Sequence, residues 1–252
     1  MKVQMPISWY DTIDSTNSEA RRHAGCIDKM AVFSARFQTA GRGQRGNKWA
    51  SKAGENLTFS ILAEFTSEDM PQVNVKDQSL LSIVSALAVS DFLTGIGMDC
   101  RIKWPNDIYV RDRKICGMLI ENSLSGDKIA SSIIGIGINL NQTEFPPELV
   151  NPVSVATATG KRIAPESALE SFLEHFRNRF AMLYDNNGRL VLRDDYISRM
   201  YRIGKWERYH DCLRNNDFEG MIKGISEEGM LLMEMPDKSI AKYAFKEVSY
   251  II

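Results

Sequence analysis

The glycine-rich run at residues 39–51 (TAGRGQRGNKWAS) most constrains the fold, because it contains the spacing G-x-G-x-x-G. A dinucleotide-binding turn with this spacing needs a helix directly after the glycines and an acidic residue about 20 positions further on. Here the run leads instead into a strand pattern at residues 57–64. The other common phosphate-binding pattern, G-x-x-x-x-G-K-[ST], does not occur in the chain. The sequence therefore predicts a flexible loop between two strands and argues against a dinucleotide-binding fold.

The remaining hydrophobic patterns predict an α+β chain in two parts. Segment 79–93 is apolar around nearly its whole circumference, which is typical of a buried helix, whereas 164–184 has the one-sided pattern of an amphipathic helix. Thr16-x-x-Glu19 fits a capping box, and short strand patterns after residue 204 predict a small barrel or sandwich. We therefore expect domains of residues 1–203 and 204–252, helices at 16–24, 79–93, 164–184 and 190–201, and strands at 31–37, 57–64, 102–110, 117–122 and 129–140.

Composition limits the kind of protein further. The net charge of the 252 residues is -1, so no global basic field attracts nucleic acid and any basic site must be local. The first residues lack the apolar core of a signal peptide, and no run approaches the roughly 20 apolar residues of a membrane span. The cysteines show neither metal nor disulfide spacing. We therefore expect a cytoplasmic protein with reduced thiols and no membrane partner.

The glycine loop is rich in groups that bind anions. Glycines let backbone N–H groups approach an anion closely, and Arg42 and Arg45 can pair with carboxylate or phosphate oxygens. Trp49 would stack on a base or pack in the core. A solvated basic loop is the alternative. Because the loop combines three flexible glycines with several cations that repel one another, we expect residues 41–48 to be mobile until an anion orders them.

Three further stretches have equally unusual compositions. Residues 103–107 (KWPND) place a cation, an aromatic ring, an amide and a carboxylate at a turn, and Lys114 lies just before a predicted strand. Gly135 and Gly137 interrupt a β-branched strand, which indicates close approach of another group to its backbone. Each feature alone has an ordinary explanation, such as a surface lysine in a turn or a β-bulge. Together with the glycine loop they favour one shared site.

These stretches, with residues 14–17 (DSTN) and 113–121 (RKICGMLIE), resemble the biotin–protein ligases of the short form without an N-terminal DNA-binding domain. The resemblance is strong over residues 9–141 and weaker beyond, including 247–249 (EVS). It implies a mixed sheet related to class II aminoacyl-tRNA synthetases, followed by an SH3-like barrel. It also implies a two-step reaction: biotin and Mg-ATP give biotinyl-5′-AMP, and a lysine of a biotin carboxyl carrier protein then takes the biotin.

The resemblance assigns roles to individual residues. It implies that Lys114 and Arg42 are catalytic and that Mg²⁺ accompanies ATP, without naming metal ligands on the chain. Two departures from the family pattern stand out: Gln44 occupies a position where many members have arginine, and Lys246 one where glycine is common. The implied biotin-binding residues are Ser15, Thr16, Asn17, Gln38, Arg42, Gly43, Gln44 and Lys114, and the implied ATP-binding residues are Arg45, Trp49, Asn106, Asp107 and Asn139.

Other functions remain open at this stage. A lipoate–protein ligase or octanoyltransferase has a similar fold, but its lipoyl pocket needs a long apolar tunnel, and the polar set at residues 15–17 and 38 suits biotin's ureido ring better. A non-enzymatic sensor of biotinyl-adenylate is a second alternative. Because the motifs begin at residue 14, we expect no specific binding to DNA. We expect residues 204–252 to support the site, and either a monomer or a homodimer agrees with the sequence.

Overall fold

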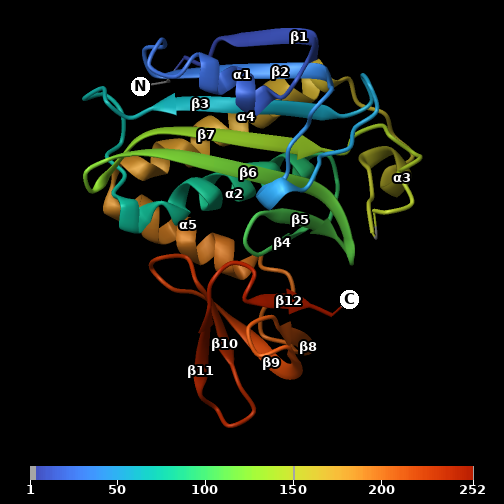
Figure 1. Cartoon of the computed structure of the whole chain (residues 1–252), viewed down its shortest axis with the longest axis vertical. Coiled ribbons are helices and arrows are strands. Elements are labelled where there is room, and N and C mark those ends of the chain that lie inside the picture. The colour runs from blue at the N-terminus through green and yellow to red at the C-terminus, as the bar shows by residue number, and fades with distance from the viewer. Residues whose placement is uncertain (1–3, 150, 252) are drawn as a thin grey trace.

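The computed structural model describes residues 4–149 and 151–251, apart from the side chain of Arg45. Its larger part is built on a mixed sheet with the strand order β1-β2-β3-β7-β6-β5-β4 (Figure 1). Strands β1 and β2 pair in parallel, and the other neighbouring strands pair antiparallel. The predicted α+β class with a mixed sheet is confirmed. The strands are Ile7–Ile13 (β1), Met30–Gln38 (β2), Leu57–Glu64 (β3), Arg101–Lys103 (β4), Asp107–Val110 (β5), Arg113–Ser125 (β6) and Lys128–Ile138 (β7).

Helices cover both faces of this sheet unequally. Helices α2 and α4 pack together and, with α5, cover one face, whereas the short helix α1 lies on the other face against β2, β3 and β7 (Figure 1). The α-helices are Thr16–Arg22 (α1), Ser79–Gly95 (α2), Val155–Thr159 (α3), Pro165–Ala181 (α4) and Asn186–Ser198 (α5). Single 3₁₀ turns occupy Gln44–Gly46 (η1), Val75–Asp77 (η2) and Met182–Tyr184 (η3). The sheet face that carries only α1 is therefore open to other segments.

Alternation along β3 explains how the two faces differ. Leu57, Phe59 and Ile61 belong to the main hydrophobic core beneath the helices. Thr58 and Ser60 alternate with them and therefore point to the face that carries α1. The Ser60 hydroxyl donates to side chains at the start of that helix. The period of two in the sequence thus separates a core face from a polar face.

Helix α2 is the buried helix that the sequence predicts. Twelve of its residues are buried, and they lie on all sides of the helix. The segment Val75–Gly95 has the length and hydropathy to cross a membrane, but 67% of its most apolar window is buried inside the protein. A helix that is apolar all round belongs in a core or a membrane, and here the sheet, α4 and α5 surround it.

A second, antiparallel sheet forms the C-terminal part, with the strand order β11-β10-β9-β8-β12 (Figure 1). This small β unit agrees with the implied SH3-like module. Its core residues Tyr209, Ile222 and Leu231 belong to the same hydrophobic cluster as the main sheet, and the indole N–H of Trp104 donates to the Gly229 carbonyl at 3.0 Å. The two parts therefore share one core. Its strands are Trp206–Asp211 (β8), Asn216–Ile225 (β9), Leu231–Glu234 (β10), Ile240–Tyr243 (β11) and Val248–Tyr250 (β12).

The structure corrects some of the local predictions. The predicted capping box is wrong, because Ser15 is the N-cap residue and the Thr16 amide donates to the Gln38 side chain. The strand expected at 102–110 is a hairpin of β4 and β5, and Lys114 lies inside β6 rather than before it. Strand β1 and helix α3 were not predicted. The edge strand β1 is mostly exposed and lacks a clear apolar stripe.

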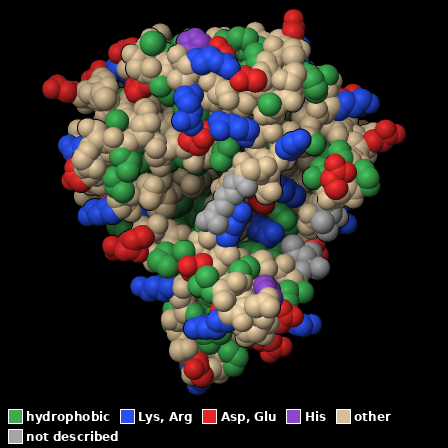
Figure 2. Space-filling model, in the orientation of Figure 1, with side chains coloured by type: hydrophobic (Ala, Val, Ile, Leu, Met, Phe, Trp, Pro, Cys, Tyr) green, Lys and Arg blue, Asp and Glu red, His purple; other side chains and the backbone are tan. Residues whose placement is uncertain are grey.

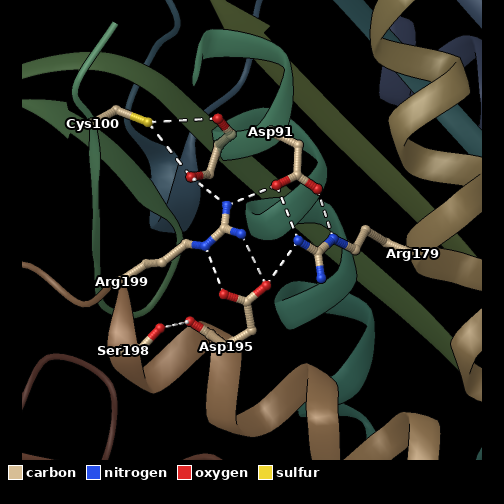
Figure 3. Close-up of polar contacts among 7 residues, drawn as sticks. Asp91, Cys100, Arg179, Asp195, Ser198 and Arg199 are labelled. Carbon is tan, nitrogen blue, oxygen red and sulfur yellow. Dashed lines mark hydrogen bonds and ion pairs between the residues drawn. The ribbon is translucent and has the colours of Figure 1, made fainter. Parts of the chain in front are cut away.

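A ring of four charged side chains joins α2, α4 and the end of α5 (Figure 3). Asp91 accepts from Arg179 at 2.6 Å and from Arg199 at 2.7 Å. Asp195 contacts the same two guanidinium groups, at 2.8 and 2.7 Å. Burial alone would raise the pKa of Asp91, but the hydrogen bonds from Arg179 and Arg199 outweigh burial and lower it. Ion pairs beside the apolar core thus connect helices α2, α4 and α5.

We predict that Asp91→Asn destabilises the protein in a pH-dependent way. Breaking a buried ion pair costs about 3–5 kcal/mol, and the partial exposure of this ring reduces the expected loss in free energy of unfolding to about 1–3 kcal/mol. Because the pKa of Asp91 is lowered on folding, its contribution is complete above the unfolded-state value of about 3.9 and is lost as pH falls through the folded-state value.

Chemical denaturation at pH 7 and at lower pH measures the effect. The difference between the wild type and Asp91→Asn should narrow below about pH 4. Asp69→Asn is the matched control, because Asp69 pairs with Lys29 at 2.7 Å but is 58% exposed, and it should change the stability little. Equal stability of Asp91→Asn and wild type at pH 7 would show that the ring contributes nothing.

Candidate functional site

A cavity of about 500 Å³ lies between the face of the sheet that carries α1, the glycine loop and the C-terminal sheet. Figure 2 shows the hollow near the level where the broad upper part narrows to the C-terminal part, with Lys and Arg side chains gathered around it. Its volume falls in the range of ordinary small-molecule sites, about 300–1,000 Å³. The cavity brings together the following predicted site residues: Ser15, Thr16, Asn17, Gln38, Arg42, Gly43, Gln44, Trp49, Asn106, Asp107 and Lys114.

One end of the cavity is a buried polar pocket at the start of α1. Thr16 donates its backbone N–H to Gln38 Oε1 at 2.8 Å, and its hydroxyl lies 3.2 Å from the same oxygen. Ser60 donates to both Thr16 Oγ1 and Asn17 Oδ1, at 2.8 and 2.6 Å, so these atoms share one hydroxyl hydrogen. Ser15, Thr16 and Asn17 are at most 4% exposed. The pocket therefore offers fixed amide and hydroxyl groups to a polar, uncharged ligand group.

Glycines on β6 and β7 make room for the side chains of this face. A Cβ atom at Gly135 would lie 2.0 Å from Asn17 Oδ1, and one at Gly137 would lie 2.3 Å from the Trp49 ring. A Cβ at Gly117 would lie 3.1 Å from the same ring. The close approach predicted for Gly135 and Gly137 is confirmed. Trp49 thus lies directly on the backbone of the sheet, where it forms a wall of the cavity.

Trp49 also has an unusual polar atom. Its Nε1 is buried and has no hydrogen-bond partner among the residues that the structure describes. An unsatisfied buried donor costs about 1–3 kcal/mol, so native proteins rarely keep one without a use. Because this nitrogen lies against the backbone at Gly137, the part of Trp49 that lines the cavity offers its aromatic surface to a ligand.

The glycine loop folds back on itself beside this wall. Arg42 and Lys48 form an isolated β-bridge, and the Gly43 amide donates to the Asn47 carbonyl at 2.7 Å across the turn η1. The Arg42 guanidinium pairs with Glu121 at 3.1 Å and remains 41% exposed. The side chain of Arg45, assigned to ATP by resemblance, lies outside the described part of the chain. Ordering of this loop by a ligand stays a prediction.

Lys114 lines the cavity from β6, and its backbone is hydrogen-bonded to the neighbouring segment. Its backbone N–H donates to the Asn151 carbonyl at 2.7 Å, and its carbonyl accepts from Val153 at 2.9 Å. Its ammonium pairs with Asp107 at 2.7 Å, with the two side chains 34% and 21% exposed. Asp107 comes from β5 and Lys114 from the neighbouring β6, so the sheet itself sets their distance. An accessible ammonium fixed in this way can bind an oxyanion of a ligand.

Two other predicted residues support the site differently. Asn106 lines the cavity, and its amide donates to the Met118 carbonyl. Asn139 does not line the cavity within the described chain; its amide is buried and donates to the Val153 carbonyl at 3.0 Å. Its side chain holds the segment that pairs with Lys114, and its assignment to ATP stays a prediction.

Sequence reasoning missed several residues of the site. Glu121 joins Asn17, Arg21 and Arg42 through one carboxylate, at 2.8, 2.7 and 3.1 Å. The signal for Ser60 was present, because a polar residue alternates with apolar ones along 57–61. The resemblance covered residues 247–249 and noted Lys246 but gave none of them a place in the site, because that place depends on how the two sheets pack. The C-terminal residues at the cavity are Cys212, Phe245, Lys246, Val248, Ser249 and Tyr250.

The charges around the cavity are mainly positive. Among the described residues that line it, Asp107 is the carboxylate. The described part of the chain contains no group of three His, Cys, Asp or Glu that could hold a metal ion. A local excess of cations thus exists on a chain whose net charge is only -1, which suits an anionic ligand. The cations are Arg42, Lys48, Lys103, Lys114 and Lys246.

The fold and the site together define a ligand-binding domain with an anion-binding cavity on a mixed sheet. Residues 9–139 match the model of the biotin/lipoate A/B protein ligase family, and the chain belongs to this family.

Relatives cover nearly the whole chain. A biotin–[acetyl-CoA-carboxylase] ligase of Paracoccus denitrificans is 33% identical over 233 residues, which are 88% of this chain and 92% of that protein. The bifunctional ligase/repressor BirA of Bacillus subtilis is 31% identical over 90% of this chain and 68% of its own length. The structure resembles a biotin protein ligase from Aquifex aeolicus in complex with biotin and ATP, with a TM-score of 0.78, 28% identity and 97% of each chain covered.

We predict that Gly137→Ala displaces Trp49 and loosens the glycine loop, because the new methyl group would lie 2.3 Å from the indole ring. Without the packing of Trp49 on Gly137, hydrogen exchange of the Trp49 and Gly43 amides should be faster, because these two amides form the hydrogen bonds that close the loop. Gly95→Ala is the matched control, since its methyl group would meet its nearest neighbour at 3.9 Å. Unchanged exchange of the loop in a folded Gly137→Ala protein would contradict this account of the wall.

Proposed function

We propose that this protein is a biotin–protein ligase, which activates biotin with ATP to biotinyl-5′-AMP and then transfers the biotin to a lysine of an acceptor protein. One observation carries the proposal: a polar, uncharged pocket and a fixed ammonium group share one cavity. Biotin has the matching ends, a ureido ring and a carboxylate. Membership of the family and the ligase relatives support the same reading.

The polar pocket suits the ureido ring. A ureido group offers two N–H donors and one carbonyl acceptor, and the hydroxyl and amide groups of Ser15, Thr16, Asn17 and Gln38 can satisfy both kinds. Their positions are fixed by the contacts with Ser60 and Glu121. Preorganised partners of this kind lower the cost of ordering side chains on binding.

Charge neutralisation is the main task of the first step. A biotin carboxylate oxygen attacks the α-phosphorus, the bond to the bridging oxygen breaks, and pyrophosphate leaves. Two anions must meet, so Lys114 and Arg42 would stabilise the approach and the charge that develops on the phosphoryl group. Both are now paired with carboxylates of the protein, Asp107 and Glu121. Gln44 lines the cavity without a charge, and hence can only donate hydrogen bonds or accept them there.

The nucleotide would lie against Trp49, Asn106 and Asp107, with Gly43 allowing close approach of the loop backbone. We propose that Mg²⁺ arrives on the triphosphate rather than at a preformed protein site. Mg²⁺ is usually bound by one or two carboxylates together with substrate phosphates. Asp107 would supply such a carboxylate, because it lines the cavity.

In the second step, the amine of the acceptor lysine attacks the acyl carbon of the mixed anhydride, AMP leaves, and the amine loses a proton. We propose a biotin carboxyl carrier protein as the acceptor, on the strength of the acetyl-CoA-carboxylase ligase relative. We propose a cytoplasmic location, because the cysteines show neither disulfide nor metal spacing in the sequence. We propose that the protein does not bind DNA specifically.

Biotin-dependent exchange of pyrophosphate into ATP tests the proposal. Exchange should require biotin, and lipoate or octanoate at the same concentration should support little, because the pocket at α1 is polar rather than an apolar tunnel. Exchange that is faster with lipoate would assign the chain to the other branch of its family. Binding of both biotin and ATP without exchange would favour a sensor.

We predict that Lys114→Ala slows formation of the adenylate by about 10²–10³, the usual loss for one preorganised donor of about 3–4 kcal/mol. Lys114→Arg should recover little, because a guanidinium is larger and planar. Lys76→Ala is the control, since this exposed lysine does not line the cavity. If a folded Lys114→Ala protein exchanged pyrophosphate into ATP at the wild-type rate, Lys114 would have no role in the first step.

A further inference from the structure

The C-terminal sheet places a cation, Lys246, at the cavity, and the assignments above leave it unused. We propose that Lys246 binds the β- and γ-phosphate oxygens of the nucleoside triphosphate, the part that leaves as pyrophosphate. This inference rests on the proposed function and adds a residue of the C-terminal unit to it.

The turn that carries Lys246 is held in place at both ends. Glu247 donates its backbone N–H to the Ala244 carbonyl at 3.1 Å, and its carboxylate accepts from the Ala244 N–H at 2.7 Å. The Glu247 carbonyl accepts from the Cys212 N–H at 2.8 Å. The stem of Lys246 therefore starts from a fixed point on the cavity wall, although the side chain itself is exposed.

The backbone of Lys246 is in a conformation that favours glycine, with φ of +70°. In the described chain, the other non-glycine residues with positive φ are Arg111, Arg202, Asn215 and Lys238, and none of these lines the cavity. A long cation thus occupies a strained position where it reaches a ligand site. Strain of this kind is often found where a side chain is needed for binding.

The charges of the neighbouring residues favour an anion at Lys246. Lys114 and Arg42 each have a carboxylate partner. Lys246 has none within ion-pair distance in the described residues, and its Nζ lies 5.9 Å from the centre of the Phe245 ring. Lys103 also lines the cavity, and its ammonium donates to the hydroxyl of Tyr109 and lies 4.9 Å from the centre of the Tyr250 ring of the C-terminal sheet. Two cations without carboxylate partners thus lie where the two sheets meet.

The excess of cations at the cavity favours the triphosphate as the ligand of Lys246. The carboxylate of biotin and the α-phosphate account for Lys114 and Arg42, whereas the two outer phosphates carry most of the remaining negative charge. Lysine is suited to phosphate as a flexible point charge with three donors. An acidic side chain of the acceptor protein is the other anion that could approach, and the experiment separates the two.

Lys246→Gly is the decisive variant, because it removes the cation while relieving the positive φ, so the fold should be kept. Calorimetric titration should show binding of ATP and of inorganic pyrophosphate weakened about 5–20-fold, the usual effect of one charge-assisted hydrogen bond. Binding of biotin and of AMP should change less than twofold. Lys246→Arg should retain most of the affinity, and Lys242→Ala, an exposed lysine of β11 outside the cavity, should match the wild type.

Thiol alkylation gives a readout that does not depend on catalysis. Cys212 is exposed and lines the cavity, whereas Cys26 is exposed elsewhere. Pyrophosphate should slow alkylation of Cys212 but not of Cys26 in the wild type, and should lose this effect in Lys246→Gly.

The outcomes are distinct. Unchanged affinity of Lys246→Gly for ATP and pyrophosphate, in a background where the wild type exchanges pyrophosphate, overturns this inference alone. A raised KM for the acceptor protein with unchanged ATP affinity overturns it too and assigns Lys246 to the acceptor. A wild-type protein that binds neither biotin nor ATP overturns the proposed function, and the inference with it.

Discussion

The contact of side chains with bare backbone on β7 is the constraint on which the site depends. Asn17 and Trp49 come from segments far apart in the sequence, and each occupies the space that a Cβ atom would take at Gly135 or Gly137. The sheet supplies a flat floor only because these positions lack side chains. The polar pocket and the aromatic wall are therefore both placed by two glycines of β7, because the absence of their side chains leaves room for Asn17 and Trp49.

Much of the fold could be predicted because periodicity reports burial directly. The apolar circumference at 79–93 identifies α2, and the alternation at 57–64 identifies β3 and its polar face. Strand β1 could not be recognised, since an exposed edge strand needs no apolar stripe. The capping box failed for a related reason: the Thr16 hydroxyl is engaged by Gln38 and Ser60, so a local pattern was overridden by partners from two other strands.

The candidate site shows the same division between local and distant information. Lys114 and Asp107 could be singled out as unusual residues near turns, but their 2.7 Å contact depends on the register of β5 and β6. The resemblance assigned Asn139 to the nucleotide together with other motif residues. The structure adds a contact that the sequence did not indicate, because the Asn139 amide donates to the Val153 carbonyl. The contribution of the C-terminal unit was least predictable. It depends on a shared core between two sheets that no short stretch of sequence encodes.

Glu121 gives the cavity a property that no single contact has. One carboxylate serves Asn17 in the polar pocket and Arg42 in the glycine loop, and Arg21 on the outer surface. The energies of these partners are consequently not independent, because a change in position or charge at one alters the field at the others. A ligand that displaces Glu121 from either partner would thereby change the hydrogen bonding and charge around the other one. The carboxylate is thus the physical link between the polar pocket and the glycine loop.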